Sequence, residues 1–240
     1  MNVSEERHEN LIFVTATSIG SNHQKLGQPN QDAVAYFCVD EDFVLSVSDG
    51  VGSCKKAEFG SRLAVDSSIK LFQEIKRGSV PFETDIITNK LIELWRSSIS
   101  NDNIDDYCAT LKVVFKIVNQ VKVISIGDGF VAISSDGLNL ISPTEGKHFT
   151  NETNCLSAQS SESDFWTADY YLDTYKPYVV FCCTDGIANG ILPGKEINLV
   201  EEIENNICVI ELRHALEDFL SDISNYCFDD MTVGVVKYER

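Results

Sequence analysis

The segment that decides the fold spans residues 43 to 50 and reads Phe43-Val-Leu-Ser-Val-Ser-Asp49-Gly50. Its first six residues are mostly β-branched, aromatic or otherwise apolar, and such a run bounded by Asp and Gly predicts a short strand. Asp49 and Gly50 follow at once, so a carboxylate stands where the strand ends. The backbone is rigid at a strand end, and the side chain there is aimed in a fixed direction.

Further aspartates border apolar segments in the same way: Asp32, Asp185 and Asp229. If these strand ends converge, four carboxylates meet in one place. Two carboxylates ~5 Å apart repel by roughly 3 kcal/mol at an effective dielectric constant of ~20. Hard divalent cations with oxygen ligands, Mg²⁺ or Mn²⁺, would neutralise such a cluster.

The Asp-Gly pair is also the strongest short signal for a tight turn. It occurs at 49–50, 128–129, 136–137 and 185–186. A turn is the better explanation of any single pair, and we assign one to Asp136-Gly137. Asp128 is interpreted as tightening a turn or hydrogen bonding near the site, and not as a metal ligand. The joint occurrence, with three acids directly beside strongly apolar segments, favours a site.

Helices and strands alternate without the strict βαβ order of a parallel sheet, which predicts antiparallel sheets covered by helices. We expect one domain over residues 1–240, with about nine strands and three long helices. The expected helices are 57–76, 83–98 and 211–223, and the expected strands are 11–17, 34–39, 43–48, 109–118, 122–126, 130–134, 138–141, 178–183 and 231–238. Short connections suggest that residues 109–141 form a meander. Residues 143–177 are polar and aperiodic, which indicates a lid, a substrate-selecting surface, or a surface excursion holding a short helix or strand.

The 240 residues carry a net charge of −18, which argues against nucleic acid or an anionic membrane surface as a partner. The first ten residues lack the apolar run of a secretory signal. The most apolar stretch, 178–183, is too short to span a bilayer. The eight cysteines include no C-x-x-C pair and are interpreted as reduced thiols, so we expect a cytoplasmic protein. We also expect a monomer.

Six short motifs follow one another in an order that resembles the metal-dependent protein phosphatases of type 2C, in particular their compact bacterial branch. They are Asn30-Gln-Asp32-Ala, Val47-Ser-Asp49-Gly50-Val-Gly52, Cys108-Ala-Thr110, Ile126-Gly-Asp128-Gly129, Thr184-Asp185-Gly186 and Asp229-Asp-Met-Thr232. Phe149-Thr-Asn-Glu-Thr153 also looks like a segment of that branch. The resemblance implies an α+β fold of four layers, in which two antiparallel β-sheets form a sandwich flanked by helices.

The resemblance implies a serine/threonine protein phosphatase that hydrolyses phosphomonoesters by direct attack of a water bridging two Mg²⁺ or Mn²⁺ ions. It implies that Asp49 bridges the two metals and that the carbonyl of Gly50 binds one of them. Asp185 and Asp229 would ligate the second metal, and Asp32 would hold metal-bound water. The catalytic residues would be Asp32 and Asp49, and the partner a phosphorylated protein.

Several positions depart from the family pattern. An arginine that holds phosphate in many members is replaced by Gly27, and His23 or Lys25 could bind phosphate instead. Eukaryotic members often have a histidine directly after the Asp-Gly pair, and this chain has Val51 there. Protonation of the leaving group would then fall to a metal-bound water or to another acid. At the position where family members commonly carry an aspartate that can bind a third metal, this chain has Asn189. Asp105 or Asp106 could contribute to that third ion instead.

Two other functions remain open at this point. The chain could be a catalytically inactive member of the same fold that acts as a regulatory or binding module. It could also hydrolyse small phosphorylated metabolites. All four acids are retained, which argues against an inactive module, and failure to bind Mn²⁺ would favour it.

Overall fold

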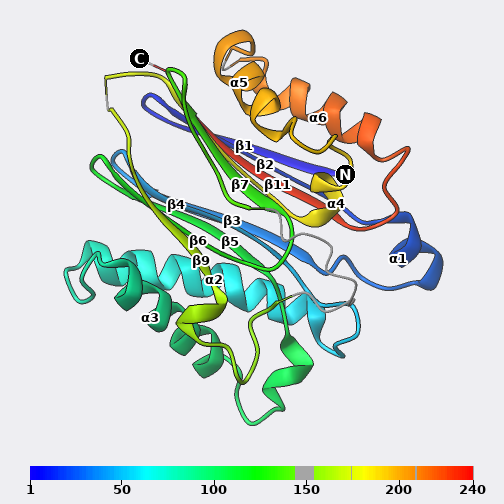
Figure 1. Ribbon diagram of the computed structural model, residues 1–240. Coiled ribbons are helices and arrows are strands. Elements are labelled where there is room, and N and C mark those ends of the chain that lie inside the picture. The colour runs from blue at the N-terminus through cyan, green and yellow to red at the C-terminus, as the bar shows by residue number, and fades with distance from the viewer. Residues whose placement is uncertain (144–153, 174, 209, 240) are drawn as a thin grey trace.

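The computed structural model describes residues 1–143, 154–173, 175–208 and 210–239. Two antiparallel sheets pack face to face, and helices cover the outer face of each (Figure 1). The α2 helix (Ala57–Lys76) and α3 (Thr84–Ser97) lie on one sheet, and α5 (Glu196–Asn206) and α6 (Leu212–Ile223) lie on the other. The expected four-layer sandwich is confirmed.

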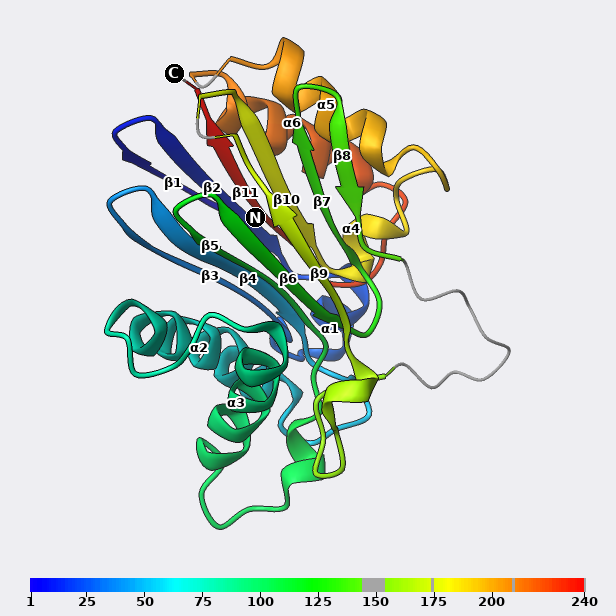
Figure 2. The same ribbon diagram turned by 60° about the vertical axis from the view of Figure 1, so that its left-hand side comes forward.

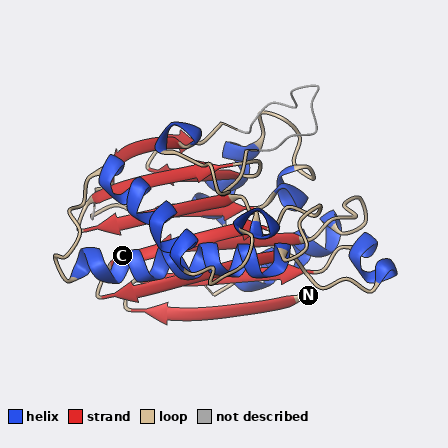
Figure 3. Ribbon diagram, turned by 90° about the horizontal axis from the view of Figure 1, so that it is seen from below, coloured by secondary structure: helices blue, strands red, loops and turns tan. Residues whose placement is uncertain are grey.

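One sheet has six strands, in the order β1 (Asn2–His8), β2 (Leu11–Ser18), β11 (Met231–Tyr238), β10 (Tyr178–Cys183), β7 (Phe130–Ser135) and β8 (Leu138–Ile141). The other has five, in the order β3 (Asp32–Val39), β4 (Asp42–Asp49), β5 (Leu111–Ile117), β6 (Gln120–Ile126) and β9 (Trp166–Tyr171). Viewed from below, α2 and α3 lie across the near face of the strands (Figure 3).

The decisive strand, β4, is buried on both of its faces. Phe43 and Leu45 enter the apolar cluster between the sheets, while Val44 faces the cluster under α2 and α3. Phe13 of the opposite sheet meets Phe43 edge to face, with ring centroids 5.7 Å apart. Because both of its faces are covered, the strand has a mostly apolar sequence up to Asp49.

The predicted meander is wrong at one connection. Asp136-Gly137 is the expected two-residue turn of the β7–β8 hairpin, with positive φ at both residues. By contrast, Gly127-Asp128-Gly129 carries the chain from β6 in one sheet to β7 in the other. A Cβ at Gly129 would stand 2.4 Å from the carbonyl oxygen of Cys183, so this crossing needs glycine.

The strands β1 and β9 and the helices α1 (Ser21–Leu26), α4 (Asp185–Ala188) and α5 go beyond the predicted elements. Both strands lie at sheet edges, and their residues alternate between more and less exposed positions, so no continuous apolar run marks them. The polar region 143–177 contains β9 and a short 3-10 helix, Glu162–Asp164. The family-like segment Phe149–Thr153 lies outside the described residues.

Antiparallel pairing brings the ends of four strands together at one end of the sandwich. The start of β3 pairs with the end of β4, and the end of β10 pairs with the beginning of β11. The short helices α1 and α4 lie at this same end (Figure 1), and the view turned by 60° agrees (Figure 2). The fold therefore gathers segments that are up to two hundred residues apart in the chain.

Candidate active site

The four predicted acids converge at this end of the sandwich. Asp32 and Asp49 are directly opposite each other on β3 and β4. Burial raises the pKa of Asp49 well above its usual range, and the charges of Asp32, Asp185 and Asp229 raise it further. A carboxyl group that is shifted by three other carboxylates lies near them, while the metal-binding roles of the four acids stay a prediction.

Asp32 is buried, with 8% of its surface exposed, and burial raises its pKa to about 7. Its Oδ2 accepts a hydrogen bond of 2.8 Å from the Oγ1 of Thr184, which joins the two sheets. Its Oδ1 is buried and receives no hydrogen-bond donor among the described residues. A buried carboxylate oxygen without a donor is costly, so this atom calls for a proton, a water or a cation.

The backbone around Asp49 is fixed by Thr110 of the Cys108-Ala-Thr110 motif. The Thr110 Oγ1 accepts from the Asp49 amide at 3.0 Å, and the Thr110 amide donates to the Asp49 carbonyl at 2.8 Å. The next residue must be glycine, because a Cβ at Gly50 would stand 2.3 Å from the carbonyl oxygen of Ala57. Here the Asp-Gly pair reflects close backbone packing at the first residue of α2.

Asp185 is the first residue of α4, immediately after Thr184 and the end of β10. Burial raises its pKa to about 7, and the charges of Asp128 and Asp229 add to this shift. Asp128 therefore lies near the site, as expected. The side-chain amide of Asn189 donates to the Asp185 Oδ2 at 3.3 Å, so the residue at the doubtful third-metal position contacts an acid of the cluster.

The structure separates the adjacent acids Asp229 and Asp230. Asp229 is exposed, and its charge raises the pKa values of Asp49 and Asp185. Asp230 is 2% exposed and accepts hydrogen bonds from the amides of Gly20 and Gln31, at 2.7 and 2.6 Å. The carboxylate of Asp230 is thus used to hold segments together, which leaves Asp229 as the acid that faces the cluster.

The two predicted phosphate-binding residues lie on α1. The Nδ1 of His23 is 2.8 Å from the Oδ2 of Asp230, so one of its ring nitrogens is already engaged. The Lys25 Nζ lies 6.0 Å from the centre of the exposed Phe228 ring. Neither position contradicts a phosphate role, which stays a prediction.

The alternative third-metal acids make contacts elsewhere. The Oδ1 of Asp105 accepts from the amide of Ala158 at 3.1 Å, and the Oδ1 of Asp106 lies 3.6 Å from the Lys55 Nζ. Both belong to the 3-10 helix Ile104–Tyr107. These contacts favour a structural role for both acids.

The donor set suits hard cations. Across the described ranges, no three His, Cys, Asp or Glu side chains form a ready-made metal-binding group. Mg²⁺ requires no such group, because it keeps several waters and binds through one or two carboxylates. Carboxylate oxygens are the ligands that such hard cations prefer, and the buried Asp32 Oδ1 has no donor among the described residues. The residues present therefore fit divalent cations.

Sequence reasoning missed Thr184 and Asp230 as organisers of this site. Thr184 bonds both Asp32 and the amide of Thr232, and thereby ties the end of β10 to β3 and β11. The available signal was a threonine close to the acids of two motifs, Thr184 directly before Asp185 and Thr232 two residues after Asp230. Nothing in the sequence shows which of two adjacent aspartates is buried.

A family model described as Protein phosphatase 2C matches residues 19–221. The chain belongs to the protein phosphatase 2C family. Comparison with curated protein sequences gives no match. The match to the family model covers the first five motifs, and the sixth, at residues 229–232, lies beyond its end.

Solved structures similar to this phosphatase 2C chain show the same fold. RsbX in complex with magnesium is 15% identical, with 99% of this chain and 100% of that chain covered and a TM-score of 0.69. The catalytic domain of the serine/threonine phosphatase PstP with two manganese ions is 16% identical, with coverages of 95% and 99% and a TM-score of 0.69. Stp1 from Staphylococcus aureus is 14% identical, with coverages of 99% and 100% and a TM-score of 0.66.

In the part of the chain that the structure describes, no helix is both long and apolar enough to cross a membrane.

Proposed function

We propose that this chain is a metal-dependent phosphatase that hydrolyses phosphoserine and phosphothreonine in proteins. The observation that carries the proposal is that Asp32, Asp49, Asp185 and Asp229 stand at one end of the sandwich, where the start of β3 pairs with the end of β4 and the end of β10 pairs with the start of β11. Membership of the family supports it, and the matched residues 19–221 include Asp32, Asp49 and Asp185. We propose that residues 1–240 form one catalytic domain, because β2 near one end of the chain pairs with β11 near the other.

Two Mg²⁺ or Mn²⁺ ions would be held by the carboxylates of Asp49, Asp185 and Asp229 and by the carbonyl of Gly50. When bound, such ions lower the pKa of a water and polarise the oxygens of a phosphoryl group. The side chains themselves hold the acids in place for this task. Thr110 fixes the backbone of Asp49, and the start of α4 fixes Asp185.

Asp32 has a different part in the proposed reaction. Its Oδ2 is committed to Thr184, and its Oδ1 has no donor among the described residues. That atom can accept a hydrogen bond or a proton from water, and the raised pKa of the group favours proton transfer near neutral pH. These contacts support the proposal that Asp32 holds and orients the attacking water.

Phosphate binding by His23 and Lys25 remains part of the proposal. The second ring nitrogen of His23, Nε2, is the atom left for a phosphoryl oxygen, because Nδ1 contacts Asp230. If His23 only holds phosphate in the ground state, His23→Ala should raise KM more than it lowers kcat. An unchanged KM would dismiss this role.

The decisive experiment is hydrolysis of p-nitrophenyl phosphate by the purified chain, first with Mn²⁺ and then with excess chelator. We expect turnover that needs the metal and disappears on chelation. Folded protein that binds no Mn²⁺ and shows no turnover would contradict the proposal and favour a non-catalytic module. Faster turnover of phosphorylated metabolites than of phosphopeptides would contradict the protein substrate.

We also propose that the chain acts in the cytoplasm as a monomer. All eight cysteines are free, which suits a reducing compartment. Sedimentation equilibrium of the purified chain tests the oligomeric state, and a mass of twice 26.7 kDa would contradict it.

A further inference from the structure

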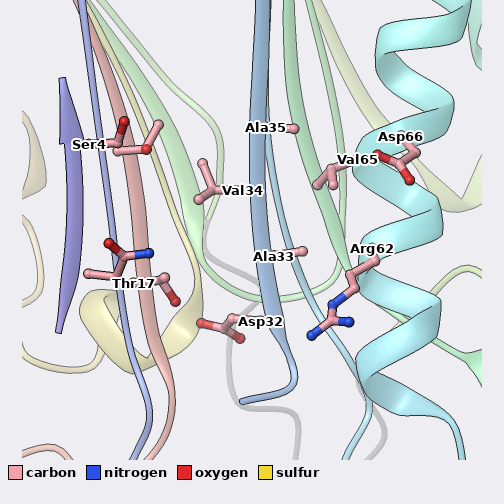
Figure 4. Close-up of a pocket in the computed structure, with 11 residues that line it drawn as sticks. Ser4, Thr17, Asp32, Ala33, Val34, Ala35, Arg62, Val65 and Asp66 are labelled. Atoms are coloured by element: carbon pink, nitrogen blue, oxygen red, sulfur yellow. The ribbon is translucent and has the colours of Figure 1, made fainter. Parts of the chain in front are cut away.

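A pocket of about 400 Å³ opens beside Asp32, between the free edges of the two sheets (Figure 4). Its walls come from β1 and β2 of one sheet and from β3 and α2 on the other side. The side chains that matter here are Thr17, Asp32, Arg62 and Asp66. The pocket therefore leads from the surface to one of the four acids of the site.

Arg62 is the cation that lines this pocket. It is exposed, and within the described residues no carboxylate lies within ion-pair distance of it, although the chain has a net charge of −18. On the same helix, Lys76 pairs with Asp42. Asp66 lies one turn along α2, yet the Arg62 side chain extends toward the level of Asp32 instead (Figure 4).

The pocket also runs along unpaired strand edges. Both β1 and β3 are terminal strands of their sheets, and Ala33, Val34 and Ala35 of β3 line the pocket. Residues 33–38 of β3 are only partly buried, as expected of an edge strand. An extended peptide can pair with the backbone of such an edge, whereas a small metabolite has no backbone to offer.

We propose that this pocket receives an extended phosphoserine or phosphothreonine peptide and that Arg62 binds its phosphoryl group beside Asp32. This inference rests on the proposed function and adds the residue and the surface that select the substrate. The five N–H donors of a guanidinium match two phosphoryl oxygens at once. A volume of about 400 Å³ exceeds a phosphoryl group and leaves room for the side chain that carries it and for neighbouring residues.

The test compares Arg62→Gln with Arg77→Gln. Arg77 follows the other end of α2, is exposed and lines no part of the pocket, so its substitution removes the same charge elsewhere. For Arg62→Gln we expect the KM for a phosphoserine peptide and the inhibition constant of inorganic phosphate to rise about tenfold, equivalent to ~1.4 kcal/mol. Arg77→Gln should leave both unchanged. Equal constants in the two variants would overturn the role of Arg62.

A separate measurement tests whether the pocket recognises a peptide and not only a phosphoryl group. We expect kcat/KM for the phosphoserine peptide to exceed that for free phosphoserine at least tenfold, and equal values would overturn it. Binding of the peptide is also measured by calorimetry in Mn²⁺, so the result does not depend on turnover. Weaker binding by Arg62→Gln than by Arg77→Gln supports the pocket even if the wild-type chain hydrolyses nothing, which would be the separate failure of the proposed function.

Discussion

Asp32 and Asp49 lie directly opposite each other on β3 and β4, so one strand pair presents two carboxylates across its ladder. Like charges in such a position destabilise a sheet. Burial raises the pKa of both groups, and Asp230 adds negative charge near Asp32. The carboxylates that can hold cations therefore also lower the stability of the fold when no cation is bound. The first three predictions rest on this trade-off between metal binding and stability.

Asp185→Asn should abolish most of the metal-dependent turnover while leaving the fold intact. The substitution removes one of the charges that raise the pKa of Asp49, and relief of repulsion among buried acids offsets the lost carboxylate. In chelator, the melting temperature should therefore equal or exceed that of the wild type. Calorimetric unfolding and p-nitrophenyl phosphate hydrolysis measure the two effects.

The matched control is Asp218→Asn, which changes an exposed acid on α6 that stands at none of these strand ends. It should alter neither turnover nor melting temperature beyond small surface effects. Near-wild-type turnover of Asp185→Asn would show that this acid holds no metal.

The stability of the metal-free chain should fall as pH rises from about 4 to about 7. Asp32 and Asp185 have folded-state pKa values of about 7, raised from 3.8 by burial. Between these values the folded chain keeps protons that the unfolded chain has released, so each step up in pH favours unfolding. Urea unfolding in chelator at pH 5 and pH 8 should give the larger free energy of unfolding at pH 5.

Mn²⁺ should reverse this trend, because cations replace the protons that are lost. The rise in melting temperature on adding Mn²⁺ should be larger at pH 8 than at pH 5. A metal-free chain that is more stable at pH 8 than at pH 5 would contradict the burial of these two acids.

Asp229→Ala and Asp230→Ala should separate metal binding from stability. Asp229 is exposed and faces the other acids, so its loss should weaken Mn²⁺ binding at least tenfold and change the free energy of unfolding by less than about 1 kcal/mol. Asp230→Ala leaves the amides of Gly20 and Gln31 without their acceptor, which should cost about 3 kcal/mol or more.

Calorimetric titration with Mn²⁺ and urea unfolding give the two readouts for both variants. The reverse result, with stability lost in Asp229→Ala and metal affinity lost in Asp230→Ala, would exchange the roles of the two residues.

The sequence predicted the parts of the fold in which burial is continuous. The bounds of α2, β10 and β11 agree with the predicted ranges, since these elements have either helical periodicity or long apolar runs. The bounds of the short edge strand β8 also agree, because the Asp136-Gly137 turn marks its start. The convergence of the acids was also predictable, because each stands at a strand end and antiparallel pairing collects such ends.

Other features depend on tertiary contacts and leave no local pattern. The edge strands β1 and β9 expose about half of their residues and read as polar segments. The burial of Asp230 arises from donors that come from residues 20 and 31, two hundred positions away. Arg62 reads as an ordinary surface residue of a helix, and only the position of α2 beside β3 brings it to the pocket.

Gly186→Ala should destabilise the chain by about 1 to 3 kcal/mol, because an added Cβ would stand 1.9 Å from the carbonyl oxygen of Asp230. That carbonyl belongs to backbone and cannot rotate away, so the start of β11 or of α4 must move, and Asp185 moves with it. Turnover should therefore fall together with stability in this variant. The control is Gly52→Ala, whose Cβ would meet only the Gln31 side chain at 3.6 Å and should cost less than about 1 kcal/mol in urea unfolding. Equal free energies of unfolding for the two variants would show that α4 does not pack against the start of β11 as closely as this structure requires.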